Sequence, residues 1–287
     1  MVDKQFQTLL SAKLQAPVKE LKPVGGGSIN QTYKIVTPDR LFFCKINSAS
    51  KFPHLFQKEK NGLALIEKQD SIKVPGIVTH FISDDQQVLV LEWIEEGTKN
   101  SQFWKTFGQQ LARLHQITNE HFGLSEANFM GSVPQSNKQH TSWISFFTQE
   151  RLLPLIQLCS KAGLLGSKHQ SQFEIFCEQL PQIFDQQKPA LVHGDLWSGN
   201  FMCTDNHQPV LIDPAVYFGH PSVDLAMSTL FGGFEKSFYE SYNYYSPFPP
   251  NYKEQWQACN LYPLLIHLYL FGNSYLYQIE ETLNKIS

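Results

Sequence analysis

The segment spanning residues 190–215 concentrates side chains that could carry out chemistry. His193, Asp195 and Asn200 follow a short apolar run, and Asp213 comes directly after a second one. A carboxylate can orient an attacking hydroxyl and accept its proton, and Mg²⁺ takes carboxylate and amide oxygens as ligands. We therefore expect phosphoryl transfer, with Asp195 directed at the acceptor hydroxyl and with Asn200 and Asp213 directed at the metal.

The order of these residues is more informative than any one of them. Residues 193–196 (HGDL) and Asn200 fit the kinase catalytic-loop pattern H-R-D-L-x-x-x-N, with glycine in place of arginine. An HGD triplet alone is common, and an aspartate after a strand is often only a turn former. The ordered set, completed by Asp213 after a β-type run, predicts a kinase catalytic loop.

A glycine-rich loop, a strand lysine and a helix glutamate precede this segment in the order that an ATP-phosphate clamp needs. Lys45 lies in the β-type run FFCKI, and Glu59 lies in the helical stretch that follows it. Taken singly, they are more typical of a hairpin turn, an exposed strand lysine and a solvated charge. Together they predict that the loop N–H groups and Lys45 hold the phosphates of ATP, while Glu59 holds the lysine. The glycine-rich loop consists of Gly25, Gly26, Gly27 and Ser28.

The apolar run LVLEWI lies where such a phosphate clamp would be connected to the catalytic segment. Glu92, Trp93 and Ile94 end this run and are candidates to bind adenine through main-chain groups. The plainer interpretation is the end of a buried strand.

The elements that must position these residues follow from the hydrophobic pattern. The pattern over the first 95 residues predicts a short helix over 3–15. It then predicts a five-stranded antiparallel sheet with one helix (54–69) after the third strand. Helical stripes dominate from residue 96 onward, apart from the β-type segment 190–215 and a predicted loop over 241–252. We expect an α+β, bilobal, protein-kinase-like fold, with an ATP-binding lobe over 1–95 and a mainly helical lobe over 96–287. The remaining predicted helices cover 101–117, 143–159, 169–184, 223–234 and 264–286.

Composition excludes several other classes of protein. Charged residues make up 17% of the chain and aromatic residues 13%, which is not the composition of a disordered chain. A net charge of −3 gives no global attraction to nucleic acid or to anionic membranes, and no apolar run is long enough to span a bilayer. The five scattered cysteines form no C-x-x-C pair, which favours a reducing, cytoplasmic location.

The motifs resemble, nearly end to end, those of the fructosamine kinase (ketosamine-3-kinase) family of the protein-kinase-like and aminoglycoside-phosphotransferase-like group. The most specific segments are HGDLWSGN and DPA-x-x-x-GH, and GGGSINQTY, FFCKIN, VLEWI, LARLH, PQSN, SWISFF and FGGF also resemble the family. The resemblance implies transfer of phosphate from Mg·ATP to the 3-hydroxyl of ketosamines, either small molecules or glycated protein lysines. The phosphorylated adduct then decomposes and frees the amine.

The resemblance also implies roles for individual residues. Asp195 would be the base, Asn200 and Asp213 the Mg²⁺ ligands and Lys45 the phosphate clamp. Trp197 would offer an aromatic face to the acceptor, although ordinary core packing explains it equally well. His220 and Asn137 are weaker acceptor-site candidates. Ser28 stands where many relatives carry cysteine, so thiol-based control through this loop is not expected.

Two alternative functions stay open at this stage. An aminoglycoside, choline or other amino alcohol could replace the ketosamine as acceptor, although no dense acidic cluster in the C-terminal half matches such cations. A nucleotide-binding pseudokinase would be expected to lack at least one of the five chemical residues, Lys45, Glu59, Asp195, Asn200 and Asp213, and all of them are present. The preferred sugar, the oligomeric state and the regulation do not follow from the sequence.

Overall fold

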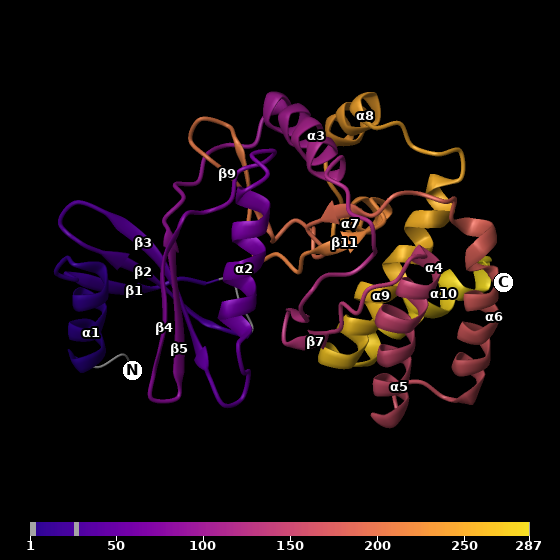
Figure 1. The fold of residues 1–287 in the computed structure, drawn as a ribbon, viewed down its shortest axis with the longest axis horizontal. Helices are drawn as coiled ribbons and strands as arrows, with labels where there is room; N and C mark the ends of the chain where they lie inside the picture. Colours follow the sequence, from indigo (N-terminus) through magenta and orange to yellow (C-terminus); the bar gives the residue numbers. More distant parts are fainter. Residues whose placement is uncertain (1–3, 26–28, 287) are drawn as a thin grey trace.

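A computed structural model describes residues 4–25 and 29–286, which form two lobes (Figure 1). The N-lobe, drawn in indigo and purple, is a five-stranded antiparallel sheet of order β1-β2-β3-β5-β4. This confirms the predicted kinase-like α+β fold. The N-lobe elements are α1 (Lys4–Leu14), β1 (Glu20–Pro23), β2 (Gln31–Val36), β3 (Leu41–Ser48), α2 (Leu55–Glu67), β4 (Ile77–Ser83) and β5 (Gln86–Glu92).

Alternation along β3 decides which way Lys45 points. Phe42, Cys44 and Ile46 lie in the buried cluster under α1, together with Phe6 and Leu10 of that helix. Side chains of adjacent strand residues point to opposite faces of a sheet. Lys45 therefore points to the other face, which α2 covers on the side toward the C-lobe (Figure 1).

Helix α2 is held by an apolar stripe at helical spacing. Leu55, Phe56, Leu63 and Ile66 are buried in one cluster with strand residues such as Leu89. This stripe leaves Glu59 on the face toward Lys45, so the helix places the carboxylate as the sequence predicts.

The C-lobe is mainly helical and is built around α9, which is buried over most of its length. Its helices are α3 (Ser101–His115), α4 (Trp143–Phe146), the π-helical turn η1 (Phe147–Leu152), α5 (Leu153–Lys161), α6 (Ser167–Ile183), α7 (Ser222–Met227), α8 (Lys236–Tyr245), α9 (Tyr252–Phe271), the 3-10 turn η2 (Asn273–Tyr275) and α10 (Leu276–Ile286). Three two-stranded antiparallel sheets complete it, pairing β6 (Asn128–Met130) with β7 (Val133–Gln135), β8 (Ala190–Val192) with β11 (Tyr217–Gly219), and β9 (Phe201–Cys203) with β10 (Pro209–Leu211).

Three predicted boundaries are wrong. The expected loop over 241–252 is shorter, because residues 241–245 continue α8 and three prolines confine the irregular segment to 246–251. The helix expected over 223–234 ends at Met227, ahead of the paired glycines 232 and 233. The helix expected over 264–286 begins earlier, at Tyr252, and is interrupted at Gly272.

The two lobes are joined by more than the connecting chain between β5 and α3. In that connector the Gly97 N–H donates to the Cys203 carbonyl at 2.8 Å. The Leu211 N–H of β10 donates to the Lys73 carbonyl of the N-lobe at 2.9 Å. These bonds fix the catalytic segment against the N-lobe. The boundary at residue 95 falls within this connector and stays a prediction.

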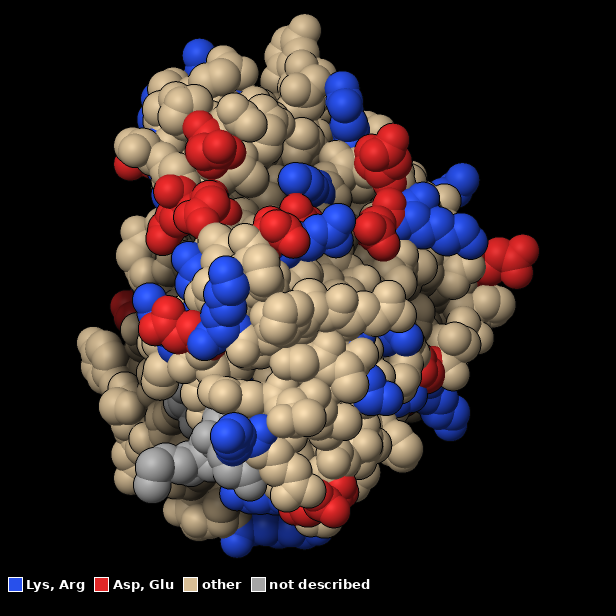
Figure 2. Space-filling view, turned by 90° about the vertical axis from the view of Figure 1, so that its left-hand side faces the viewer, with Lys and Arg blue, Asp and Glu red and all other residues tan. Residues whose placement is uncertain are grey.

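The outer surface of the N-lobe carries charges of both signs. Figure 2 shows Lys and Arg side chains interspersed with Asp and Glu over this face. Among the described residues, none of the helices has the length and apolar content that crossing a membrane requires.

Candidate active site

The loop between β8 and β9 presents the predicted base at the cleft between the lobes. The Asn200 amide donates to the Asp195 carboxylate at 2.9 Å and to the Asp195 carbonyl at 2.8 Å. Both of these bonds use the Asn200 nitrogen, so neither of them occupies its side-chain oxygen. Asp195 and Asn200 are thus held together by the loop that their spacing predicted.

Asp224 of α7 binds the backbone of this loop. Its fully buried carboxylate accepts the N–H groups of His193 at 2.7 Å and Gly194 at 2.8 Å, and it lies 3.1 Å from Nε2 of His115. Burial would raise the pKa of Asp224, but His115, His193 and the Gly194 N–H outweigh it and leave the pKa lowered. Asp224 therefore braces the catalytic loop, and His115 lies in the core beside it.

Gly194 explains why this loop departs from the H-R-D pattern. Its φ is +82°, and a Cβ at this position would lie 2.2 Å from the Ala215 carbonyl oxygen. Only glycine adopts this conformation at no steric cost, and only glycine admits the close approach. Glycine in place of the arginine of the H-R-D pattern therefore allows the catalytic loop to lie directly against the segment that carries Asp213.

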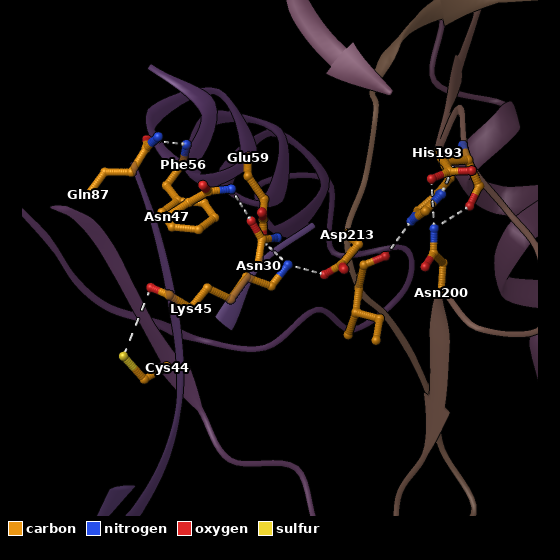
Figure 3. Close-up of polar contacts among 12 residues, drawn as sticks. Asn30, Cys44, Lys45, Asn47, Phe56, Glu59, Gln87, His193, Asn200 and Asp213 are labelled. Atoms are coloured by element: carbon orange, nitrogen blue, oxygen red, sulfur yellow. Dashed lines mark hydrogen bonds and ion pairs between the residues drawn. The ribbon is translucent and has the colours of Figure 1, made fainter. Parts of the chain in front are cut away.

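Lys45 joins the two halves of the site. Its Nζ lies 2.8 Å from Glu59 of α2 and 2.5 Å from Asp213, which follows β10 in the C-lobe. Figure 3 shows the Lys45 side chain crossing from the N-lobe toward Asp213, with His193 and Asn200 beyond it. The predicted strand lysine, helix glutamate and second aspartate therefore meet in one place.

The electrostatics of the site reflect three carboxylates and one cation in a buried setting. Burial, reinforced by the charge of Asp213, raises the pKa of Asp195 to about 7. Burial likewise raises the pKa of Glu59 to about 7, against the opposing effect of Lys45. The pKa of Lys45 is raised because Asp213 and Glu59 together outweigh the effect of burial. Additional positive charge at the site would stabilise the ionised forms of these carboxylates.

The donor set fits a hard divalent cation bound together with phosphates. Asp213 offers a carboxylate whose side chain is 42% exposed, and Asn200 offers an amide oxygen beside it in the same cleft. Mg²⁺ typically takes one or two protein oxygens and completes its shell with phosphate and water. Within residues 4–25 and 29–286 no cluster of three His, Cys, Asp or Glu side chains could hold a metal alone.

A cleft of about 200 Å³ contains most of the predicted chemical residues. Lys45, Glu59, Asp195, Asn200 and Asp213 all line it, and so does the acceptor candidate Trp197.

Most of the predicted glycine-rich loop lies outside the part of the chain that the structure describes. Gly26, Gly27 and Ser28 lie outside the described residues, and Gly25 precedes them. Ile29 and Asn30 line the cleft, and the Asn47 side chain of β3 donates to both of them.

Two further acceptor candidates lie elsewhere. His220 is buried between Trp143 and Phe184, and burial lowers its pKa to about 3. Asn137 is also buried, and its side chain bonds to Asn128, to the Glu126 carbonyl and to Arg151. Neither residue lines the cleft, so both have positions typical of structural support.

The adenine candidates lie at the start of the connector. Glu92 is the last residue of β5, and its N–H donates to the Gly76 carbonyl. The Trp93 ring lies under Nζ of Lys34, 4.1 Å from the ring centroid, and Ile94 is buried. None of the three lines the cleft that contains Lys45 and Asp213, and their role in binding adenine stays a prediction.

One wall of the cleft does not follow from the sequence. Helix α9 contributes Ile266, His267, Leu270 and Phe271, and the β6–β7 hairpin contributes Asn128 to Gly131. Apolar residues on all sides of α9 hide which face opens to the cleft. The exposure of Phe271, at 52%, marks that face only once the fold is known.

Fold and site together define a kinase: a bilobal phosphotransferase fold with a lysine–glutamate pair, a catalytic-loop aspartate and a second aspartate in one cleft. The family model for fructosamine kinase matches residues 2–287. A "Probable ketoamine kinase" of Synechocystis sp. is 38% identical over 272 residues, which is 93% of this chain and 90% of that protein. The chain therefore belongs to the fructosamine kinase family.

Further relatives agree with this membership. The chloroplastic protein-ribulosamine 3-kinase of Arabidopsis thaliana is 32% identical over 266 residues, covering 90% of this chain and 79% of that protein. The crystal structure of a "putative fructosamine-3-kinase" from Thermobifida fusca superposes with a TM-score of 0.89 at 27% identity, covering 98% of this chain and 97% of that one. The aminoglycoside phosphotransferase APH(4)-Ia, in complex with AMP-PNP and hygromycin B, shares the fold alone, with a TM-score of 0.62–0.63 at 13% identity, 99% of this chain and 97% of that one being covered.

Proposed function

We propose that this protein transfers the γ-phosphoryl group of ATP, with Mg²⁺, to the 3-hydroxyl of ketosamines, and that the phosphorylated adduct then releases the free amine. The observation that carries the proposal is the convergence of Lys45, Glu59, Asp195, Asn200 and Asp213 in one cleft. The family membership and the ribulosamine 3-kinase relative support the acceptor class.

The residues divide the work of phosphoryl transfer among them. Asp195 accepts the proton of the attacking hydroxyl, and its bond to Asn200 fixes the direction in which the carboxylate points. Lys45, held by Glu59, binds phosphate oxygens. Asp213 and the Asn200 oxygen would hold Mg²⁺, which would neutralise charge on the phosphates. Main-chain groups of Glu92, Trp93 and Ile94 bind adenine.

The other acceptor classes fit the cleft less well. Polycationic aminoglycosides call for acidic groups on the acceptor side. In the described cleft lining the acidic residues are Glu59, Asp195 and Asp213, all of which belong to the phosphate and metal side. The lining contributed by α9 is apolar or neutral, which suits a ketosamine with one amine better than an aminoglycoside.

The proposal is tested by an ADP-release assay with Mg·ATP. The acceptors are ribulose-lysine, erythrulose-lysine, fructose-lysine, choline and kanamycin. We expect turnover of at least one ketosamine, and Asp195→Asn to lower kcat by about 10²–10⁴ while ATP still binds. The matched control is Asp205→Asn, which changes an exposed aspartate outside the cleft lining. Turnover only of choline or kanamycin would reject the acceptor class, and an unchanged kcat in Asp195→Asn would reject the base.

A further inference from the structure

The loop after α7 holds an aromatic residue in an unfavourable place. Phe231 has a φ of +54° and is followed by Gly232 at +104° and Gly233 at +71°. A bulky side chain in this left-handed region is uncommon and strained, and such strain persists where the surroundings enforce it, often at functional sites. The ring is also 38% exposed, so burial does not account for its position.

The neighbours of Phe231 connect it to the cleft. Its ring centroid lies 5.9 Å from that of Trp197, with the two rings at 82°. It lies 4.8 Å from His267 and 6.4 Å from Tyr275, the latter ring being at 83°. Trp197 and His267 both line the cleft, so Phe231 lies directly against its wall. Rings that meet at nearly a right angle form a corner with aromatic faces on two sides.

This corner is electrically neutral in its side chains. The Nδ1 of His267 bonds to the Pro263 carbonyl at 2.7 Å, and burial lowers the pKa of His267, which favours the uncharged ring. The charged residues of the described cleft lining are Lys45, Lys58, Glu59, Asp195 and Asp213, and none of them comes from α9 or from the loop that carries Phe231. A cation at this corner would therefore be bound by aromatic faces and not by a carboxylate.

We propose that Phe231 and Trp197 form an aromatic corner that binds the ammonium nitrogen carried by the acceptor beside its sugar. This inference rests on the proposed function, since a ketosamine carries one secondary ammonium group next to the sugar carbons. Cations pack on aromatic faces within about 6 Å of the ring centroid, and sites for alkylated ammonium groups commonly use several rings. Phe231 is then a specificity-determining residue that selects amine-linked sugars.

The test compares two acceptors in two variants. The acceptors are ribulose-lysine and its analogue with an ether oxygen in place of the amine nitrogen. Phe231→Leu keeps an apolar side chain at the strained position and removes the aromatic face. We expect it to raise the KM for ribulose-lysine about 3- to 30-fold, with the KM for ATP unchanged. Phe231→Tyr, which keeps an aromatic face, recovers most of that loss.

The ether analogue separates ammonium binding from packing. We expect Phe231→Leu to leave its KM unchanged, because the analogue carries no cation next to the sugar. An equal loss with both acceptors, or a parallel change in the KM for ATP, would show that Phe231 only packs the loop and would overturn the proposal. Tyr244→Leu is the matched control, since Tyr244 is an aromatic residue 80% exposed on α8.

A binding measurement keeps the two proposals separable. If wild-type protein phosphorylates neither sugar, the proposed function fails, and the corner is tested by ligand-observed NMR with n-butyl(methyl)ammonium and n-butyl methyl ether. Selective binding of the ammonium that Phe231→Leu abolishes would support the aromatic corner. Equal binding of the two probes, or binding that the variant does not change, would overturn it.

Discussion

Asp224 shows how a residue outside the cleft can determine the geometry inside it. Its carboxylate accepts two consecutive N–H groups of the catalytic loop, from His193 and Gly194, immediately before Asp195. The His193 ring in turn bonds to the Ile212 carbonyl next to Asp213. One buried carboxylate therefore fixes the backbone that carries Asp195 and, through His193, the backbone next to Asp213.

Replacing Asp224 by asparagine tests this bracing. The variant keeps the size of the side chain but turns an NH₂ group toward donors that need an acceptor. We expect Asp224→Asn to lower the free energy of unfolding by about 1.5–3 kcal/mol and to reduce kcat. Urea unfolding measures the first effect, with Asp39→Asn in an exposed turn as control. An unchanged unfolding midpoint would contradict the bracing role.

Lys45 is the residue on which both lobes converge, so its loss should affect catalysis strongly. Lys45→Met leaves Glu59 and Asp213 without the cation that they share. We expect kcat to fall roughly 10²–10³-fold, as for other losses of a preorganised donor at a reacting oxygen. Steady-state kinetics on the ketosamine that the protein phosphorylates fastest measure this. Lys68→Met, at an exposed position just after α2, should retain activity; a similar fall there would point to a general effect of charge.

The crossing of α3 and α8 positions the helical partners of Asp224. His115 lies at the end of α3, and its Nδ1 lies 2.8 Å from the Tyr242 hydroxyl of α8. The two helices meet closely at Gly108, where a Cβ would lie 2.3 Å from the Phe238 carbonyl oxygen. A glycine in mid-helix costs about 1 kcal/mol relative to alanine, so its presence here reflects the close contact.

Gly108→Ala tests that contact. Added bulk in a packed interface costs about 1–3 kcal/mol, and the gain in helix propensity offsets about 1 kcal/mol of that. We expect a net loss of stability together with a loss of activity, because α8 must move away from His115. Tyr242→Phe, which removes only the hydroxyl, is the comparison and should cost about 0.5–1.5 kcal/mol. A Gly108→Ala protein as stable as wild type would show that α8 accommodates the methyl group without strain.

The spacing of residues along the chain was enough to predict which polar side chains meet in the cleft. The rest of the cleft depends on tertiary packing and could not be predicted. Asp195 and Asn200 sit on one loop, and Lys45 and Glu59 follow from strand alternation and a helical stripe. The strands β6 and β7 have three residues each, which is too short for the alternation of apolar and polar residues to be recognised in the sequence. Helix α9 carries apolar residues on all sides, so the sequence does not indicate which of its faces lines the cleft. His220 resembles a polar site residue in sequence, but its surroundings are aromatic.

At the scale of the whole molecule, one hydrophobic cluster extends across the boundary between the lobes. One buried cluster contains Leu63 of α2 and Leu89 of β5 together with Phe107 of α3 and Leu211 of β10. The interlobe ion pair between Lys58 and Glu126, at 2.6 Å, lies beside it. A shared core of this kind couples the stability of the two lobes, so we expect them to unfold together.

The cysteines make this coupling measurable. All five are free thiols, with Cys44 in the N-lobe sheet and Cys159 in the C-lobe core. Burial raises the pKa of Cys44 to about 12 and that of Cys159 to about 11, so these two thiols form almost no thiolate in the folded protein at pH 8. We expect both to resist alkylation in the native state, with the half-buried Cys177 reacting first.

Site-resolved alkylation along a urea gradient, read by peptide mass spectrometry, then tests the shared core. Because the buried cluster crosses the lobe boundary, Cys44 and Cys159 should become reactive at the same urea concentration. If Cys44 reacted at distinctly lower urea, the N-lobe would open independently, and the core would have to be treated as two. Phe107→Ala, which removes a fully buried ring from the shared cluster, should lower the urea midpoint of both thiols and cost about 3–5 kcal/mol. A shift confined to Cys159 would show that the contacts across the lobe boundary contribute little to stability.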